Sequence, residues 1–225
     1  MPATRVCRLG DLGEITPSPS SDLFTNLAGD VTGTPVIAPG DIEAGRVVER
    51  ARLRSLASVT HALERFRVRP GDLVVVRQGA VGRTALIEER SRDWIYHSAC
   101  VRVRPDPAFV DPGFLAAYLA YPPVLDQLLA RTNVGTVTTV TSSVLAGLEV
   151  VLPALEDQKT LARALREVDT QMDLHRQTLT RLEALKPALM SHALGGEVPG
   201  GRSEEHPGAP AARRVARGPR VRRMS

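Results

Sequence analysis

The chain has 225 residues, and its 43% hydrophobic content is enough for one domain of good size with an appendage, or for two small domains. The formal net charge is +4, but residues 199–225 contribute seven arginines and two glutamates, which leaves −1 for residues 1–198. A polyanion would therefore have to be bound by residues 1–198 through local placement of charge and not through bulk charge.

Several classes of protein are not expected from this sequence. No apolar run approaches the roughly 18–20 residues that span a bilayer, and the first residues lack an apolar signal core, so we expect a cytoplasmic protein. Cys7 and Cys100 do not form a disulfide framework, and no Cys/His cluster has zinc spacing. We expect both cysteines to be ordinary core or surface residues.

Composition divides the chain into three regions, and their mixture of strand and helix patterns predicts an α+β fold class. Residues 1–153 mix short apolar runs with Gly, Pro and polar breaks, which is typical of a strand-rich domain with a few helices. Residues 154–195 show one long helical pattern, and residues 196–225 are rich in Gly, Pro and Arg and are predicted to be disordered. The expected strands are 34–37, 46–48, 73–76, 84–87, 99–103 and 148–152.

Helix signals follow the strand-rich part. Asp111-Pro112 predicts a helix start, because Asp can cap the first turn and Pro fits its first position. Pro122-Pro123 should end that helix, and a second short helix is expected to follow. The polar, β-branched stretch 132–139 is expected to be a loop with many hydrogen-bonding side chains.

The long helical pattern has the spacing of a coiled-coil seam. Positions separated by alternating steps of four and three carry Leu161, Leu165, Val168, Met172, His175, Leu179, Leu182, Lys186 and Leu189. Seven of these nine side chains are apolar. At 1.5 Å per residue, a helix over 157–194 would be about 57 Å long, so we expect it to need a partner helix. The alternative is a helix folded back on its own domain.

Seven segments in order resemble one half of a type I restriction–modification specificity subunit. They are RLGDLGEITPSPS (8–20), TPVIAPGDI (34–42), PGDLVVVRQGAVGRTALI (70–87), ACVRVRPD (99–106), FLAAYLA (114–120), GTVTTVTSSVLAGLEVVLPALEDQ (135–158) and LKPALMSHALGGEV (185–198). The resemblance covers residues 5 to about 198. It implies a target recognition domain over 1–153 followed by a spacer helix over 154–195.

The resemblance also implies a function and its partners. Such subunits read double-stranded DNA without catalysis, dock adenine-N6 methyltransferase subunits that use S-adenosylmethionine, and in full systems also dock a DNA-translocating restriction subunit. The usual pattern has two recognition domains and two antiparallel helices, whereas this sequence shows one of each. A homodimer, or pairing with a different half-subunit, would rebuild a reader of a bipartite target.

Two surfaces are candidates for contact with DNA. Arg77, Gln78, Gly79 and Arg83 follow the strand 73–76, and Arg and Gln suit bidentate contact with guanine and adenine edges. The alternative is a tight hairpin in which Arg77 forms an internal salt bridge. Basic and hydroxyl side chains elsewhere could hold phosphates, and the candidates are Arg52, Arg54, Arg67, Thr136 and Thr138. A solvated basic face and a structural crossover are the alternatives for these.

Motifs for catalysis are missing from the sequence. A methyltransferase would need an Asn/Asp-Pro-Pro-aromatic motif with a glycine-rich loop, and Asp111-Pro112-Gly113-Phe114 is only a near miss that a helix start explains. No phosphate-cradling loop is present, and the five histidines have no evident nucleophile partner. We therefore expect no catalytic residue, metal or cofactor. The alternative function is a non-catalytic regulator or decoy that binds a methyltransferase through its helix without reading DNA.

Overall fold

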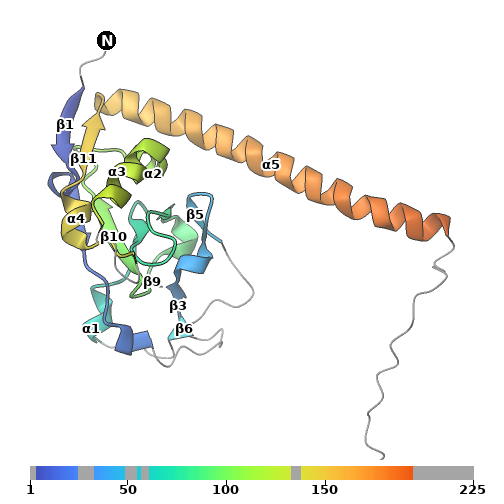
Figure 1. The fold of residues 1–225 in the computed structure, drawn as a ribbon, viewed down its shortest axis with the longest axis horizontal. Coiled ribbons are helices and arrows are strands. Elements are labelled where there is room, and N and C mark those ends of the chain that lie inside the picture. The colour runs from blue at the N-terminus through green and yellow to red at the C-terminus, as the bar shows by residue number, and fades with distance from the viewer. Residues whose placement is uncertain (1–3, 25–32, 49–54, 57–60, 133–137, 195–225) are drawn as a thin grey trace, which may run out of the picture. The chain divides into compact units, whose positions relative to one another are not determined.

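The computed structural model describes residues 4–24, 33–48, 55–56, 61–132 and 138–194 (Figure 1). Residue contacts divide the chain after Asp173, so the first unit holds the strands and the first half of the long helix. We call the described residues that precede this helix the head. The predicted tail 196–225, with its predicted disorder, lies outside the described residues.

A four-stranded antiparallel sheet forms the centre of the head, in the order β2-β10-β7-β8. Its strands are β2 (Gly13–Thr16), β10 (Cys100–Pro105), β7 (Leu73–Val76) and β8 (Thr84–Leu86). All four residues of β7 are buried, because Leu73 and Val75 enter one apolar core while Val74 and Val76 enter another. Burial on both faces explains why this strand is a continuous apolar run without alternation.

The first core lies under three short helices and a two-stranded ribbon. The ribbon pairs β1 (Arg5–Arg8) with β11 (Glu149–Leu152) in antiparallel fashion. The helices are α2 (Pro112–Ala120), α3 (Pro122–Ala130) and α4 (Ser142–Ala146). The Asp111 carboxylate accepts the Phe114 N–H at 2.9 Å and caps α2, which confirms the predicted helix start.

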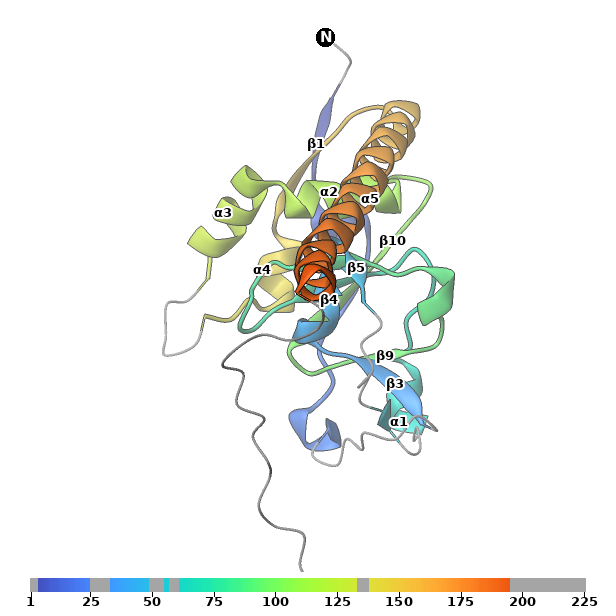
Figure 2. The ribbon, with the colours of Figure 1, turned by 90° about the vertical axis from the view of Figure 1, so that its right-hand side faces the viewer.

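The second core lies at the other end of the head. A three-stranded sheet bounds it, in the order β6 (Ser55–Leu56), β3 (Thr34–Ile37) and β9 (Ile95–Tyr96). A hairpin of β4 (Ile42–Glu43) and β5 (Arg46–Val47) also borders this core. The short helix α1 (His61–Glu64) completes its boundary. Four 3₁₀ turns complete the described head: Leu9–Asp11, Ser21–Phe24, Pro39–Asp41 and Glu89–Ser91. Two perpendicular views place α2 and α3 at one end and β3, β9 and α1 at the other (Figures 1 and 2).

The long helix α5 (Leu155–Ala193) is continuous over 39 residues, as the sequence predicts (Figure 1). Its first turns are anchored to α2. The buried Gln158 accepts the Asp111 N–H at 2.9 Å and donates to the Pro153 carbonyl at 3.0 Å. Ala162 is also buried, and a Cβ added to Gly113 would lie 3.3 Å from the Ala162 methyl group. A larger residue at Gly113 would therefore crowd the contact between α2 and α5.

Candidate nucleic-acid interface

The loop between β7 and β8 ends in an exposed tip. Gln78, Gly79 and Ala80 are exposed, whereas Val76 and Gly82 on either side are buried. Gly79 has φ +84°, and a Cβ built on it would meet no atom within 4 Å. Glycine is therefore favoured at position 79 by the positive φ, and not by a lack of space for a side chain.

Gly82 holds the base of the same loop. Its φ is also +84°, but a Cβ built on it would collide with the Leu125 side chain of α3. The Gly82 N–H donates to the Val76 carbonyl at 2.9 Å, and the Val76 N–H donates to the Arg83 carbonyl at 2.8 Å. The loop is therefore closed at its base by backbone bonds and covered there by α3.

Arg77 is bonded to three other segments of the head. Its Nε donates to the Val140 carbonyl at 3.3 Å, and its Nη1 donates to the Ser18 hydroxyl at 3.3 Å and the Ser98 carbonyl at 3.5 Å. Its backbone N–H donates to the Ala99 carbonyl at 2.9 Å. These side-chain bonds are longer than most N–H···O hydrogen bonds, and each is therefore weak, but together they join segments that are far apart in the sequence.

The tip lies beside the segment 138–140. The Val140 N–H donates to the Arg77 carbonyl at 2.9 Å, and Gln78 forms an isolated antiparallel bridge with Thr139. Thr138 is partly exposed next to this bridge. The structure thus brings Arg77, Gln78 and Gly79 together with Thr138, while Thr136 lies outside the described residues. We call Gln78, Gly79, Ala80 and Thr138 the tip surface.

The other predicted arginines that the structure describes, Arg67 and Arg83, are not part of the tip surface. Arg67 makes a bidentate ion pair with Glu64, at 2.7 and 3.1 Å, and donates to the Asp93 carbonyl at 2.7 Å. Hydrogen bonding to Glu64 raises the pKa of Arg67 and lowers that of Glu64. Arg83 donates to the Ile42 carbonyl at 3.3 Å. Arg52 and Arg54 lie outside the described residues, so the structure does not place them.

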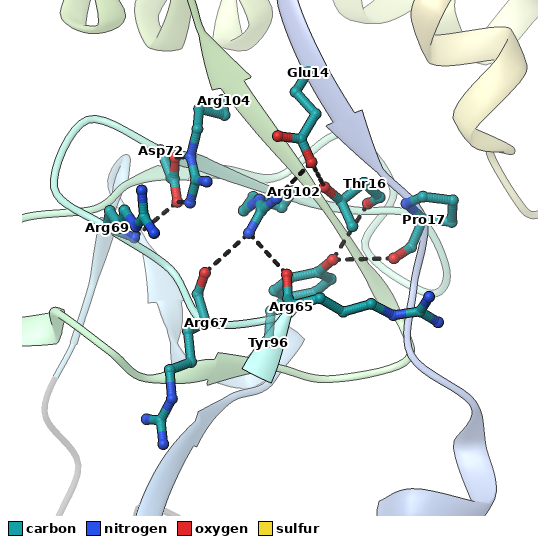
Figure 3. Close-up of polar contacts among 10 residues, drawn as sticks. All are labelled: Glu14, Thr16, Pro17, Arg65, Arg67, Arg69, Asp72, Tyr96, Arg102 and Arg104. Carbon is teal, nitrogen blue, oxygen red and sulfur yellow. Dashed lines mark hydrogen bonds and ion pairs between the residues drawn. The ribbon is translucent and has the colours of Figure 1, made fainter. Parts of the chain in front are cut away.

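A polar network at the centre of the head was not predicted from the sequence. The Arg102 guanidinium is buried, and it donates to the backbone carbonyls of Arg65 and Arg67 at 3.0 and 2.9 Å (Figure 3). It also donates to the Glu14 carboxylate at 2.8 Å and to the Thr16 hydroxyl at 2.6 Å. In Figure 3 the side chains of Arg65 and Arg67 point away from Arg102, so the network fixes the backbone that carries them.

Two neighbouring groups share this interior. Arg104 makes a bidentate ion pair with the buried Asp72 carboxylate, at 2.7 and 2.8 Å (Figure 3). The hydroxyl of Tyr96 donates to the Pro17 carbonyl at 3.0 Å, and burial raises its pKa. The sequence signal for these contacts is the alternation of Val and Arg in β10, because an arginine within a buried strand requires an internal partner.

Neither a metal site nor a membrane-spanning helix is found among the residues that the structure describes. No group of three or more His, Cys, Asp or Glu side chains could hold a metal ion within that part of the chain. Cys100 is buried, as expected for a core residue, and burial raises the pKa of its thiol to about 12. No described helix is both long enough and apolar enough to cross a membrane.

The predicted seam of α5 is uncovered in the structure. Its apolar members are between 37% and 58% exposed, and they are Leu161, Leu165, Val168, Met172, Leu179, Leu182 and Leu189. Within the first unit, the head leaves Leu161, Leu165, Val168 and Met172 at least one-third exposed. We use the word seam below for these seven residues.

Comparisons with known proteins identify the family. The family model for the type I restriction modification DNA specificity domain matches residues 4–184, so the chain belongs to this family. Members of such a family are non-catalytic DNA-recognition components, which agrees with the sequence analysis. The specificity subunit of the type I restriction enzyme EcoBI from Escherichia coli is 26% identical over 171 residues, which are 74% of this chain and 36% of that subunit.

Solved structures share the fold at lower sequence identity. A chain from work on complex assembly and conformational transition of the type I R-M system has a TM-score of 0.62 at 21% identity, covering 84% of this chain and 44% of that one. The HsdS subunit from Thermoanaerobacter tengcongensis has a TM-score of 0.57 at 18% identity, over 92% and 51%. The S subunit from M. genitalium has a TM-score of 0.54 at 15% identity, over 76% and 40%. The chain thus spans between about a third and a half of the length of these relatives.

Proposed function

We propose that the chain reads one half of a bipartite DNA target and is paired through α5. In this proposal it directs an adenine-N6 methyltransferase that uses S-adenosylmethionine, while it takes no cofactor itself. In a restricting system, a DNA-translocating restriction subunit would dock on the same assembly. The observation that carries the proposal is the uncovered seam on a helix that begins directly behind a head of the DNA-specificity family.

The energy of covering the seam supports pairing. Its side chains are about half exposed, and fully burying one apolar side chain contributes about 1.5–3 kcal/mol. Covering the exposed halves in two chains therefore contributes on the order of 10–20 kcal/mol, against an association cost of about 4–15 kcal/mol. The gain is comparable with the cost or above it, which supports a second helix of the same kind as the partner.

The identity of the paired chain decides the symmetry of the target. Two identical chains related by a twofold axis would present the same tip surface twice and would read an inverted repeat. A different half-subunit would give an asymmetric target. In both arrangements, the helices would fix the gap between the two half-sites.

Methylation of a host genome tests the proposal. The chain is co-expressed with a candidate methyltransferase, and the genome is analysed by methylation-sensitive sequencing. We expect adenine methylation at one bipartite motif, which disappears when the chain is omitted. Methylation without any motif, or no dependence on the chain, would contradict the proposal. If the chain binds the methyltransferase and lowers methylation, it is the decoy of the alternative function.

A further inference from the structure

Within the tip surface, the structure separates a residue that can contact DNA from the residue that holds it. We propose that Gln78 recognises the edge of an adenine base and that Arg77 is its positioning residue. This inference rests on the proposed function, because it concerns the residue through which the chain distinguishes DNA sequences. It assigns a role that neither the family match nor the overall fold assigns to any side chain.

Arg77 has too few free donors to recognise a base in the usual bidentate way. A bidentate contact uses two neighbouring N–H groups of the planar guanidinium. Nε is engaged by Val140, and Nη1 is engaged by Ser18 and Ser98. Only Nη2 makes no hydrogen bond to the residues that the structure describes. A bidentate contact that uses Nη2 needs either Nε or Nη1 as its second donor. Each of these two nitrogens would first have to give up an internal hydrogen bond.

The bonds of Arg77 hold the segments around the tip together. One guanidinium joins the loop after β7 to the segment at Val140, the turn at Ser98 and the segment at Ser18. The Ser18 hydroxyl donates in turn to the Cys100 carbonyl of β10, at 2.6 Å. The Arg77 side chain therefore acts together with the backbone bonds of the loop to hold the tip against the central sheet, which is the role of a positioning residue.

Gln78 differs from Arg77 because its side chain is exposed and not bonded to other segments of the head in the described residues. Its backbone is held by the bridge to Thr139. A glutamine amide presents one donor and one acceptor side by side, which matches the N6 and N7 groups of adenine in the major groove. Gly79 follows with open space around its Cα, so a DNA strand can approach the backbone there.

The remaining members of the tip surface fit supporting roles. Ala80 offers only a methyl group, and Thr138 offers a hydroxyl, which suits a phosphate oxygen. Arg83, at the far end of the loop, is exposed but donates to the Ile42 carbonyl. Among the described residues of the tip surface, Gln78 alone has a side chain with paired donor and acceptor groups.

Selection from a random duplex library tests the assignment of Gln78. The full chain, together with its methyltransferase, is used to enrich bound DNA, and the preferred motif is determined by sequencing. For Gln78→Ala, we expect discrimination to fall about 5- to 150-fold at one adenine of each half-site, which corresponds to 1–3 kcal/mol. For Gln78→Glu, we expect a shift toward cytosine at that position, because a carboxylate only accepts and cytosine N4 donates.

The matched control is Gln177→Ala, at an exposed glutamine of α5 outside the seam, which should leave the motif unchanged. Unchanged motifs in both Gln78 variants, with a clear motif for the unmodified chain, would overturn the inference and leave the proposed function standing. An unmodified chain that enriches no motif would refute both. These results keep the two failures apart.

Variants of Arg77 test the positioning role. For Arg77→Ala, we expect weaker binding to all sequences and a lower melting temperature, with the same preferred motif. Arg77→Lys keeps the charge but has a single nitrogen, so it should restore only part of the melting temperature. A changed base preference in Arg77→Lys at an unchanged melting temperature, with no change in Gln78→Ala, would show that Arg77 is the base-contacting residue. If Arg77→Ala does not fold, the lysine and Gln78 variants still decide.

Discussion

At the residue scale, two arginines of strand β10 show that the role of an arginine depends on its surroundings. Arg102 and Arg104 are two positions apart on β10, yet Arg102 contacts Glu14 and two backbone carbonyls while Arg104 contacts Asp72. The Nε of Arg102 is buried without a partner among the described residues. Each arginine is thus part of the framework of the head. In a chain with 29 basic residues, an arginine count alone says little about a DNA-binding surface.

The Glu14 contacts predict a pH dependence of stability. Hydrogen bonding by Thr16 lowers the pKa of Glu14 below 4.5, and the charges of Arg102 and Arg104 act in the same direction against some desolvation. A lowered folded-state pKa adds stability above the unfolded pKa, and this stability is lost as pH falls through the folded pKa. We expect Glu14→Gln to show a smaller loss of unfolding free energy below pH 4.5 than the unmodified chain, measured by urea denaturation. Asp126→Asn, at an exposed position of α3, is the control and should keep the full loss.

The two glycines of the tip loop form a matched pair for substitution. Gly79 and Gly82 have the same positive φ, but only Gly82 is covered by Leu125. We expect Gly79→Ala to cost about 1–2 kcal/mol from the left-handed backbone alone. Gly82→Ala should cost more than this, because the new methyl group must also push the end of the Leu125 side chain aside. Urea midpoints measure both losses, and equal losses would contradict the contact of Leu125 with the loop.

At the element scale, local patterns predict much of the architecture. The apolar run of β7, the Asp-Pro start of α2 and the spacing of α5 are all found in the structure where the sequence indicates them. The short strands β1, β2, β4, β6 and β9 were not predicted. Three of them, β4, β6 and β9, have only two residues, and β1 alternates weakly. Except for β4, which pairs with the adjacent β5, these strands depend on partners distant in the sequence, as in the pairing of β1 with β11.

The candidate site was predictable only in part, for a related reason. From the sequence alone, the side chains of Arg77 and Gln78 are equally suited to base recognition. Their roles separate only when Val140, Ser18 and Ser98 come near Arg77, and no local pattern encodes those contacts. The seam, by contrast, depends only on spacing along one helix.

Charges placed in the seam should prevent pairing. We expect the unmodified chain to be a dimer and Leu165→Glu with Leu179→Glu to be a monomer, measured by light scattering. Each new carboxylate would otherwise be buried without a partner, which is costly. The control carries the same two charges at exposed positions outside the seam, Thr170→Glu with Gln177→Glu, and should remain dimeric. A monomeric unmodified chain would argue against pairing through α5.

The length of α5 should set the gap between half-sites. Inserting seven residues after Gln177 keeps the seam in phase and adds about 10 Å, at 1.5 Å per residue. At 3.4 Å per base pair, this should lengthen the unspecified gap by about three base pairs without changing the half-sites. Methylation-sensitive sequencing reads the gap directly. A two-residue insertion, which breaks the phase, should abolish methylation; an unchanged gap after the seven-residue insertion would disprove the proposed role of α5.

At the scale of the whole molecule, charge is unevenly distributed along the chain. Residues 199–225 contain seven arginines and two glutamates, whereas residues 1–198 are nearly neutral. We expect deletion of 199–225 to weaken DNA binding at low salt and to reduce the salt dependence of the binding constant, because fewer counterions are released. The methylated motif should stay the same. A changed motif would show that these residues take part in recognition.

The exposed tip has a further consequence for how new targets arise. In a pair of identical chains, every amino-acid change occurs in both reading ends at once. A single codon change at Gln78 would then redirect both arms of a palindrome in one step, and any modifying or cleaving enzyme that relies on the same reader would follow. Specificity could thus drift without a mismatch between the enzyme that marks the genome and the enzyme that attacks unmarked DNA.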